Sequence, residues 1–423
     1  MDENVVLANI AAIITKDILF DDKNYSGVQQ KFMQTNFHGK NPSGTKLDED
    51  EEFYLQQTIF NNKNHTQNPT NKCQTNQKKR KMHDFSTSKP KFSRQTLDKN
   101  IEIKELNLLN DFESNDFENQ LHMSKNTFIS IFQMVRVLLA KKFSKRTIPS
   151  QTVFSLAMWK LTTDEHFEEI SRKFEIPLNT CIEVIRQFWN IIAYNYETFI
   201  KWPKTQHAQQ TTMNDFKMRP ELSQFPKCIF GIITLKRLDI FLETENEEMP
   251  IILQIISNAK NEIIDCFVEF AQKYNFDETP IGLALSRKTI PENSFLIGNK
   301  YFPLKHYLLR PFEQGCTSKQ AAFNSLLEPA LNMGTRVLDN IAKRFNVLYA
   351  LEAKDLVEVR RIVETICSLH NLCIDNEDGY VKKKREANNF NWASSGKAPN
   401  VRIGETSFGN KRRADLVETI IGK

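Results

Sequence analysis

Residues 229–270 read IFGIITLKRLDIFLETENEEMPIILQIISNAKNEIIDCFVEF, and this stretch decides the fold class. It contains three short apolar runs, at residues 229–235, 250–257 and 263–270. Runs of roughly four to eight apolar residues have the length of buried strands. A fourth run of the same kind follows at residues 294–298. The sequence therefore predicts a buried sheet between residues 225 and 304.

Apolar residues at helical spacing lie on both sides of this predicted sheet. Before it, the spacing predicts helices over residues 128–140, 151–162, 167–174 and 179–196. After it, the spacing predicts helices over residues 322–331, 336–349 and 356–373, with a last short helix near 414–421. The predicted fold class is α+β, with a helical domain at 101–204 followed by an α/β domain at 220–375.

The two ends of the chain differ in composition from this centre. Residues 20–100 are rich in Asn, Gln, Lys, Thr and Ser, so we expect the arm over 1–100 to be largely disordered. The tail over 376–423 is basic, and we expect it to be mostly flexible. The arm contains a basic cluster, which is either a nuclear import signal or a solvated charge run: Lys78, Lys79, Arg80 and Lys81.

The whole-chain composition narrows the possible classes of protein. The net charge of +5 over 423 residues permits nucleic acid as a partner without requiring it. The seven cysteines contain no CxxC pair, which argues against a zinc ribbon or a disulfide framework and favours a reducing compartment. The first twenty residues have the wrong polarity for a signal peptide, and no apolar stretch has the length of a membrane span. We therefore expect a soluble, intracellular protein with no membrane partner.

Residues 161–186 have the apolar spacing of a helix-turn-helix. We expect the second helix to begin with Asn179 or Thr180 as its cap. In a DNA-reading unit, its exposed residues would be Asn179, Thr180, Glu183 and Arg186. One arginine beside one glutamate is a weak face for reading a groove. The alternative is a helical hairpin used only for packing or for contact with a partner.

Seven motifs occur in a fixed order over roughly two hundred residues. They are Phe225-Pro226-Lys227-Cys228, the strand and turn at 251–264 with Gln254, FLIGNKYFPL at 295–304, Phe323-Asn324, the helix at 336–348, CSLHN at 367–371 and KRRADLV at 411–417. Together they resemble the FPxxxGxxDGTH, INxQxVCD, LLGDSGYPL, FN, VIERAFGxLKxRFxxL, CxLHN and KRRxxLV motifs of PIF/Harbinger transposases and their domesticated relatives, a DDE-type family. The resemblance implies an RNase H-like mixed sheet with helices on both faces.

The resemblance also implies a cluster of carboxylates that hold divalent metals for DNA cleavage. Without gaps, the three acid positions of the family fall on Ile233, Asn299 and Asp339. Aligning on Gly231 instead moves the first position to Thr234, which is no better a ligand. Only Asp339 is a carboxylate, so two of the three expected acids are replaced.

Further family acids are also replaced. Asn258 and Asn275-Phe276 occupy their positions, and only Asp277, one residue along, could fill one of them. Lys236 and Lys300 add positive charge where cations would bind, so we expect Asp339 to form a salt bridge rather than a metal site. We expect His370 of CSLHN, in the middle of a helix, to be a packing or capping histidine.

These observations predict a catalytically inactive, transposase-derived nuclear protein without a cofactor. The resemblance implies a Myb/SANT- or MADF-like protein partner, and hence an adaptor role in a chromatin or transcription complex. Two alternatives stay open. The first is direct DNA binding through the helix-turn-helix. The second is a nuclease with a rebuilt Mg²⁺ or Mn²⁺ site around Asp339 and Asp277.

Overall fold

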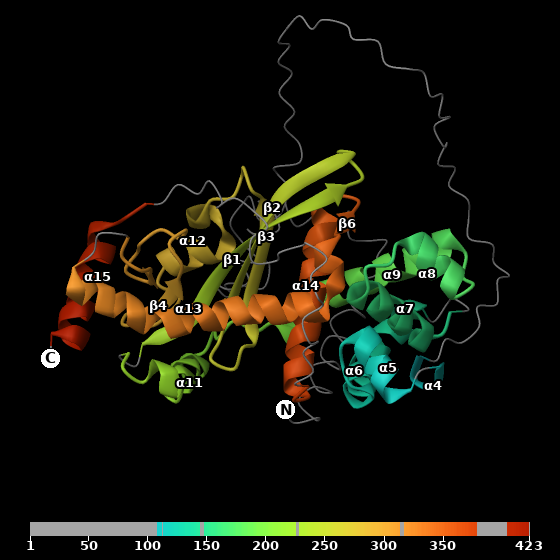
Figure 1. Ribbon diagram of the computed structural model, residues 1–423, viewed down its shortest axis with the longest axis horizontal. Helices are drawn as coiled ribbons and strands as arrows, with labels where there is room; N and C mark the ends of the chain where they lie inside the picture. Colours follow the sequence, from blue (N-terminus) through green and yellow to red (C-terminus); the bar gives the residue numbers. More distant parts are fainter. Residues whose placement is uncertain are drawn as a thin grey trace, which may run out of the picture. The chain divides into compact units, whose positions relative to one another are not determined.

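The computed structural model describes residues 108–111, 113–143, 148–225, 228–313, 317–378 and 404–422 (Figure 1). The basic cluster at residues 78–81 and the rest of the predicted polar arm lie outside these residues. The α-helices are α4 (Leu108–Asp111), α5 (Ser114–Leu121), α6 (Lys125–Phe143), α7 (Ser150–Thr162), α8 (Phe167–Lys173), α9 (Leu178–Tyr194), α10 (Tyr196–Phe199), α11 (Gln206–Lys217), α12 (Pro280–Ser286), α13 (Ser318–Arg344), α14 (Leu356–Asp375) and α15 (Ser407–Ile421).

The sheet lies where the apolar runs predict it. Its strands are β1 (Ile229–Leu242), β2 (Glu247–Ser257), β3 (Ile263–Phe270), β4 (Phe295–Gly298), β5 (Leu308–Leu309) and β6 (Glu352–Ala353). Their order is β3-β2-β1-β4-β5, and β6 pairs with the far end of β1. β1, β2 and β3 are antiparallel, whereas β4 and β5 run parallel to β1. The prediction of a mixed α/β structure is therefore confirmed.

β1 continues beyond the predicted end at residue 235. Leu238, Ile240 and Leu242 are buried at every second position, which is the period of a strand with one buried face. The strand then turns into β2 through residues that include Asn246, whose φ is +54°. The apolar run in the sequence ends at residue 235 because three of the next four residues are charged: Lys236, Arg237 and Asp239.

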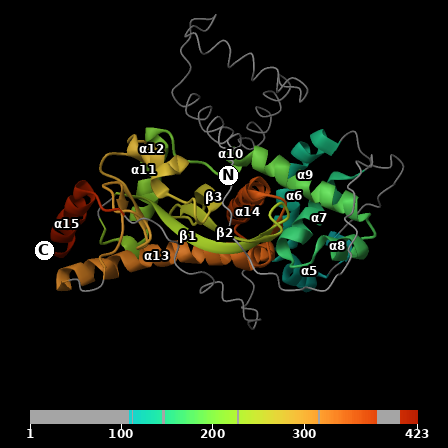
Figure 2. The same ribbon diagram turned by 90° about the horizontal axis from the view of Figure 1, so that it is seen from above.

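α13 is one helix where the sequence spacing predicted two, over 322–331 and 336–349. That prediction is wrong, because Gly334 does not end the helix but lies buried within it. A Cβ at Gly334 would lie 2.8 Å from Cγ2 of Ile232 and even closer to Thr234 in β1. The glycine therefore allows α13 to pack directly on β1 (Figure 2). The helix begins with a capping box from Thr317 and Gln320, and residues 346–349 form a 3-10 turn instead.

One hydrophobic core joins the early helices to the sheet. It includes Phe154 of α7, Trp189 of α9, Leu238 of β1, Ile341 of α13 and Ile366 of α14. Residues 100–423 form one compact unit. A second core lies around Phe295, Phe323 and Val417. Within the described ranges, no helix is long and apolar enough to cross a membrane.

Candidate functional site

The first two predicted acid positions lie side by side in the sheet. Ile233 of β1 is paired in parallel register with Gly298 of β4, and Asn299 follows Gly298 directly. The third position, Asp339, is in α13, the helix that packs on β1. The fold therefore places these positions on neighbouring elements, and their side chains decide what the region can do.

The side chain at Ile233 is part of the hydrophobic core. It is 1% exposed, and a Cβ built on Gly298 would lie 3.0 Å from its Cγ2. The same Cβ would lie 2.6 Å from Phe302, whose ring contacts Phe276 at 5.7 Å between centroids. An apolar group among apolar neighbours provides no donor atom to a cation.

Asn299 has a local role in the turn that follows β4. Its Oδ1 accepts a hydrogen bond from the backbone N–H of Tyr301 at 3.0 Å. Its backbone carbonyl accepts one from the N–H of Phe302 at 3.2 Å. An asparagine side chain that bonds the backbone two residues on is a standard stabiliser of turns.

Asp339 lies near a lysine of β1. Side chains alternate between the faces of a strand, so Ile232, Thr234 and Lys236 share the face that packs against α13, whereas Ile233 lies on the other. Burial lowers the pKa of Lys236, and the neighbouring carboxylate of Asp339 opposes this shift. Thr234, the alternative first acid position, is thus the one on the α13 face, and the charge nearest to Asp339 on that strand is positive.

The remaining candidate acids have partners of their own. Asp277 forms an ion pair with Lys305 at 3.0 Å. The carboxylate of β1, Asp239, forms one with Arg237 at 3.3 Å. Asn258 accepts hydrogen bonds from the backbone N–H groups of residues 260 and 262 in the β2–β3 turn. In the part of the chain that the structure describes, no group of three or more His, Cys, Asp or Glu side chains could hold a metal ion.

The two helices predicted over residues 161–186 are present as α8 and α9. However, α9 begins at Leu178 with Pro177 before it, so the prediction that Asn179 or Thr180 caps the helix is wrong. Pro177 is the N-cap itself, and its carbonyl accepts a hydrogen bond from the N–H of Cys181 at 2.9 Å. Thr180 was expected to be exposed, but only 5% of it is exposed to solvent. Asn179 is exposed, as expected.

Arg186 forms ion pairs with two carboxylates, one in the β1–β2 turn and one in α14. Its Nη2 lies 2.6 Å from Oε1 of Glu243 in the β1–β2 turn, and its Nε lies 2.7 Å from Oε1 of Glu358 in α14. Its guanidinium also lies 6.0 Å from the ring centroid of Phe167. Glu183 accepts a hydrogen bond from Gln187. The expected groove-reading arginine is therefore already engaged within the chain.

The net charge of the α8–α9 segment is a second argument against contact with DNA. Residues 161–186 contain six acidic and three basic side chains, a net charge of −3 with histidine neutral. DNA binding proteins gain most of their affinity by neutralising phosphates with lysine and arginine. A segment with a net negative charge repels the phosphate backbone of DNA.

The CSLHN motif holds the edge of the sheet. Asn371 accepts a hydrogen bond from the backbone N–H of Ile263 at 2.8 Å and donates to its carbonyl at 2.7 Å. It also donates to the carbonyl of Phe199. His370 contacts the carbonyl of Asn261 at 3.1 Å, and burial lowers its pKa to about 4. The prediction of a packing histidine is confirmed, whereas the role of Asn371 was not predicted.

A second motif asparagine uses the same geometry. Asn324 of the Phe323-Asn324 pair donates to the carbonyl of Phe312 at 3.0 Å and accepts from its N–H at 2.7 Å. Each carboxamide thus pairs with both backbone groups of one distant residue, as a neighbouring strand would. The spacing of the motifs did not predict these backbone partners of Asn371 and Asn324.

A comparison with family models, with curated proteins and with solved structures finds no match to this chain. The resemblance of its motifs to PIF/Harbinger transposases therefore stays a prediction, and the functional argument rests on the geometry above.

Proposed function

We propose that this chain is a transposase-derived protein that no longer cuts DNA and acts in the nucleus as an adaptor between proteins. The observation that carries the proposal is the position of Lys236 beside Asp339 on the α13 face of β1. On the family pattern, this is where carboxylates would gather around metal ions.

The physical argument concerns charge. Two divalent metals need several carboxylates to balance their charge and fix their coordination. Here the α13 face of β1 carries Thr234 and Lys236, while Ile233 is buried on the other face of the strand and Asn299 is engaged in a turn. The positive charge of Lys236 opposes the binding of a cation near Asp339.

The mixed sheet, with α13 packed on one face and Phe276 and Phe302 near Ile233 on the other, fits the RNase H-like core that the resemblance implies. The α8–α9 segment fits the helix-turn-helix prediction in its spacing. Its negative charge and the engagement of Arg186 favour a protein partner over DNA. By the resemblance, that partner is a Myb/SANT- or MADF-like protein.

The test is purification of the tagged chain from nuclear extract, with and without DNase, followed by identification of bound proteins. We expect a protein set that survives DNase. Loss of every partner with the DNA would contradict the adaptor role and favour direct DNA binding.

A matched variant separates the two outcomes. Asn179→Ala removes an exposed polar group at the start of α9 without touching the ion pairs of Arg186. Direct DNA binding through this helix predicts weaker DNA affinity in the variant and a steep fall of affinity with salt. The adaptor role predicts that neither DNA affinity nor nuclear localisation changes.

A further inference from the structure

The basic motif near the C-terminus is not a free tail. Residues 404–422, named the C-terminal clamp below, dock on the chain around β4 and β5, and α15 begins at Ser407 rather than near residue 414 as predicted. The clamp starts as an extended segment beside Leu304. The N–H of Leu304 donates to the carbonyl of Gly404 at 2.9 Å, and the N–H of Thr406 donates to the carbonyl of Leu304 at 3.1 Å.

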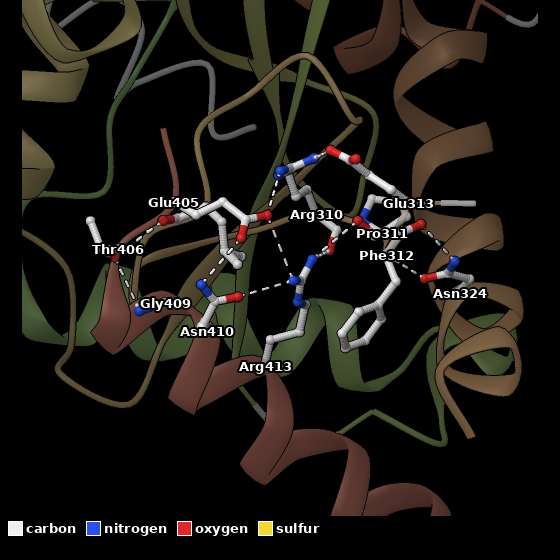
Figure 3. A network of polar contacts seen from close by, with 11 residues as sticks. Arg310, Pro311, Phe312, Glu313, Asn324, Glu405, Thr406, Gly409, Asn410 and Arg413 are labelled. Carbon is white, nitrogen blue, oxygen red and sulfur yellow. Dashed lines mark hydrogen bonds and ion pairs between the residues drawn. The ribbon is translucent and has the colours of Figure 1, made fainter. Parts of the chain in front are cut away.

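Arg413 of the clamp occupies a site made for a guanidinium (Figure 3). Its guanidinium lies 3.9 Å from the ring centroid of Phe312. It donates to the carbonyl of Pro311 at 3.2 Å and to Oδ1 of Asn410 at 3.1 Å. The residue is 6% exposed, so these contacts replace nearly all of its water. An aromatic face together with carbonyl acceptors is the typical environment of a buried arginine.

The clamp also provides a carboxylate, that of Glu405, which pairs with a buried arginine of the chain. The side chain of Arg310, which follows β5, is only 2% exposed. Its Nη2 lies 2.6 Å from Oε1 of Glu405 in the clamp, and its Nη1 lies 3.2 Å from Glu313, which is 71% exposed (Figure 3). A buried charge without a close partner is strongly unfavourable, so Glu405 ties the clamp to the segment after β5.

Arg412 extends the same contact to the other end of β4. It donates to the backbone carbonyls of Glu292 at 3.1 Å and Asn293 at 2.7 Å, which lie just before the strand. Its guanidinium lies 5.6 Å from the ring centroid of Phe295. The two neighbouring arginines therefore bind the chain where it enters β4 and where it continues after β5.

We propose that the C-terminal clamp is an intramolecular ligand, whose Arg412 and Arg413 are recognised by main-chain carbonyls and an aromatic ring, and that it fixes the two loops that flank β4 and β5. The basic motif of residues 411–413 then serves this recognition rather than nuclear import or binding of DNA. The inference goes beyond the proposed function, because it depends on neither the partner nor the loss of cleavage.

Amide hydrogen exchange on the full-length chain tests the proposal. Arg413→Ala removes the ring and carbonyl contacts, and we expect exchange within residues 304–313 to become at least about tenfold faster. Amides of α6, α7 and α9 are expected to keep their exchange rates. Lys411→Ala is the matched control, because it removes the same charge from an exposed position in the same helix. It is expected to change nothing, while Arg413→Lys recovers only part of the protection.

A second variant covers the case in which Arg413→Ala does not fold. Arg412→Ala leaves the buried site intact and is expected to speed exchange only around residues 291–296. Equal effects of Arg413→Ala and Lys411→Ala, or a uniform rise over the whole chain, would overturn the clamp.

Measurements of nuclear localisation and DNA affinity test whether residues 411–413 act as an exposed basic signal. If residues 411–413 acted as a basic signal, exposed Lys411 would contribute at least as much as buried Arg413. We expect Lys411→Ala to leave nuclear accumulation and DNA affinity unchanged. A loss of either on this substitution would contradict the proposal.

Discussion

The α14–β3 edge and the β1–α13 face both contain motifs that resemble those of PIF/Harbinger transposases, yet their side chains make different contacts. At the edge, Asn371 and His370 reach backbone groups more than one hundred residues away and hold β3 in place. Near that face, Ile233 packs into the core on the opposite side of β1, and Asn299 bonds within its own turn. The motif residues that stabilise the fold match the family pattern, and those that would bind metal do not.

The contacts of α14 with β3 close one edge of the sheet. β3 is at the edge of the sheet, where an open backbone invites pairing with other chains. In the described structure, α14 covers that edge with Asn371 at one end and with Arg360, which donates to the carbonyl of Val268, at the other. The proposed adaptor role depends on such a closed edge and not on carboxylates at residues 233 and 299.

The strongest test of the comparison is Asn371→Ala. The substitution leaves the N–H and the carbonyl of Ile263 and the carbonyl of Phe199 without their partner. We expect the free energy of unfolding to fall by roughly 3 kcal/mol, since buried groups that lose a partner are expensive. Asn376→Ala, which removes one bond to Leu372 within the same helix, is the control and is expected to reduce it by less than about 1 kcal/mol. Urea unfolding of both variants measures this, and equal losses would break the comparison.

The second prediction also concerns the α14–β3 edge: His370 makes the free energy of unfolding depend on pH. Its pKa is about 4 in the folded chain against a usual 6.5, so the unfolded chain binds the proton first as the pH falls. Stability is therefore lost between pH 6.5 and 4, and roughly 2 kcal/mol of this loss is present at pH 5. His370→Gln removes the titrating group, so its stability is expected to fall less between pH 7.5 and pH 5 than that of the unchanged chain. Parallel profiles would show that His370 is not buried in its neutral form.

Asp265 of β3 links the two sides of the comparison, because it lies in the row of paired residues that crosses the sheet to Ile233. Ile233 pairs with Ile256 and Ile256 with Asp265, whose buried Oδ2 has no hydrogen-bond partner within the described structure. Burial raises the pKa of Asp265 from 3.8 to about 7, so stability falls as the pH rises through that range.

Asp265→Asn removes this titration. Because the residue as a whole is partly exposed, we expect a reduced effect, with the variant gaining about 1–2 kcal/mol relative to the unchanged chain between pH 5 and pH 8. Urea unfolding at both pH values measures it. A difference that does not vary with pH would mean that Asp265 is solvated.

The smallest expected effect belongs to Lys236 and Asp339. A double-mutant cycle with Lys236→Met and Asp339→Asn is expected to give a coupling energy below about 1 kcal/mol, because both side chains are partly exposed. A coupling of several kcal/mol would instead mean that the two groups form a buried pair central to the fold.

Much of the fold could be predicted from the sequence, because apolar runs and helical spacing are local signals. The strands at 250–257, 263–270 and 294–298 lie within a few residues of their observed bounds. The fusion of α13 could not be predicted, since Gly334 reads as a helix breaker unless its contact with Thr234 is known. The engagement of Arg186 was equally hidden, because Glu243 lies 57 residues away in the sequence.

The most direct test of the central claim, that the family acid positions no longer hold metal, is calorimetric titration of the full-length chain with Mn²⁺, beside Asp339→Asn. We predict that the two proteins give the same heats, because Lys236 rather than a set of carboxylates lies near Asp339. Saturable binding that is lost in Asp339→Asn would contradict the account and would reinstate a metal-dependent nuclease.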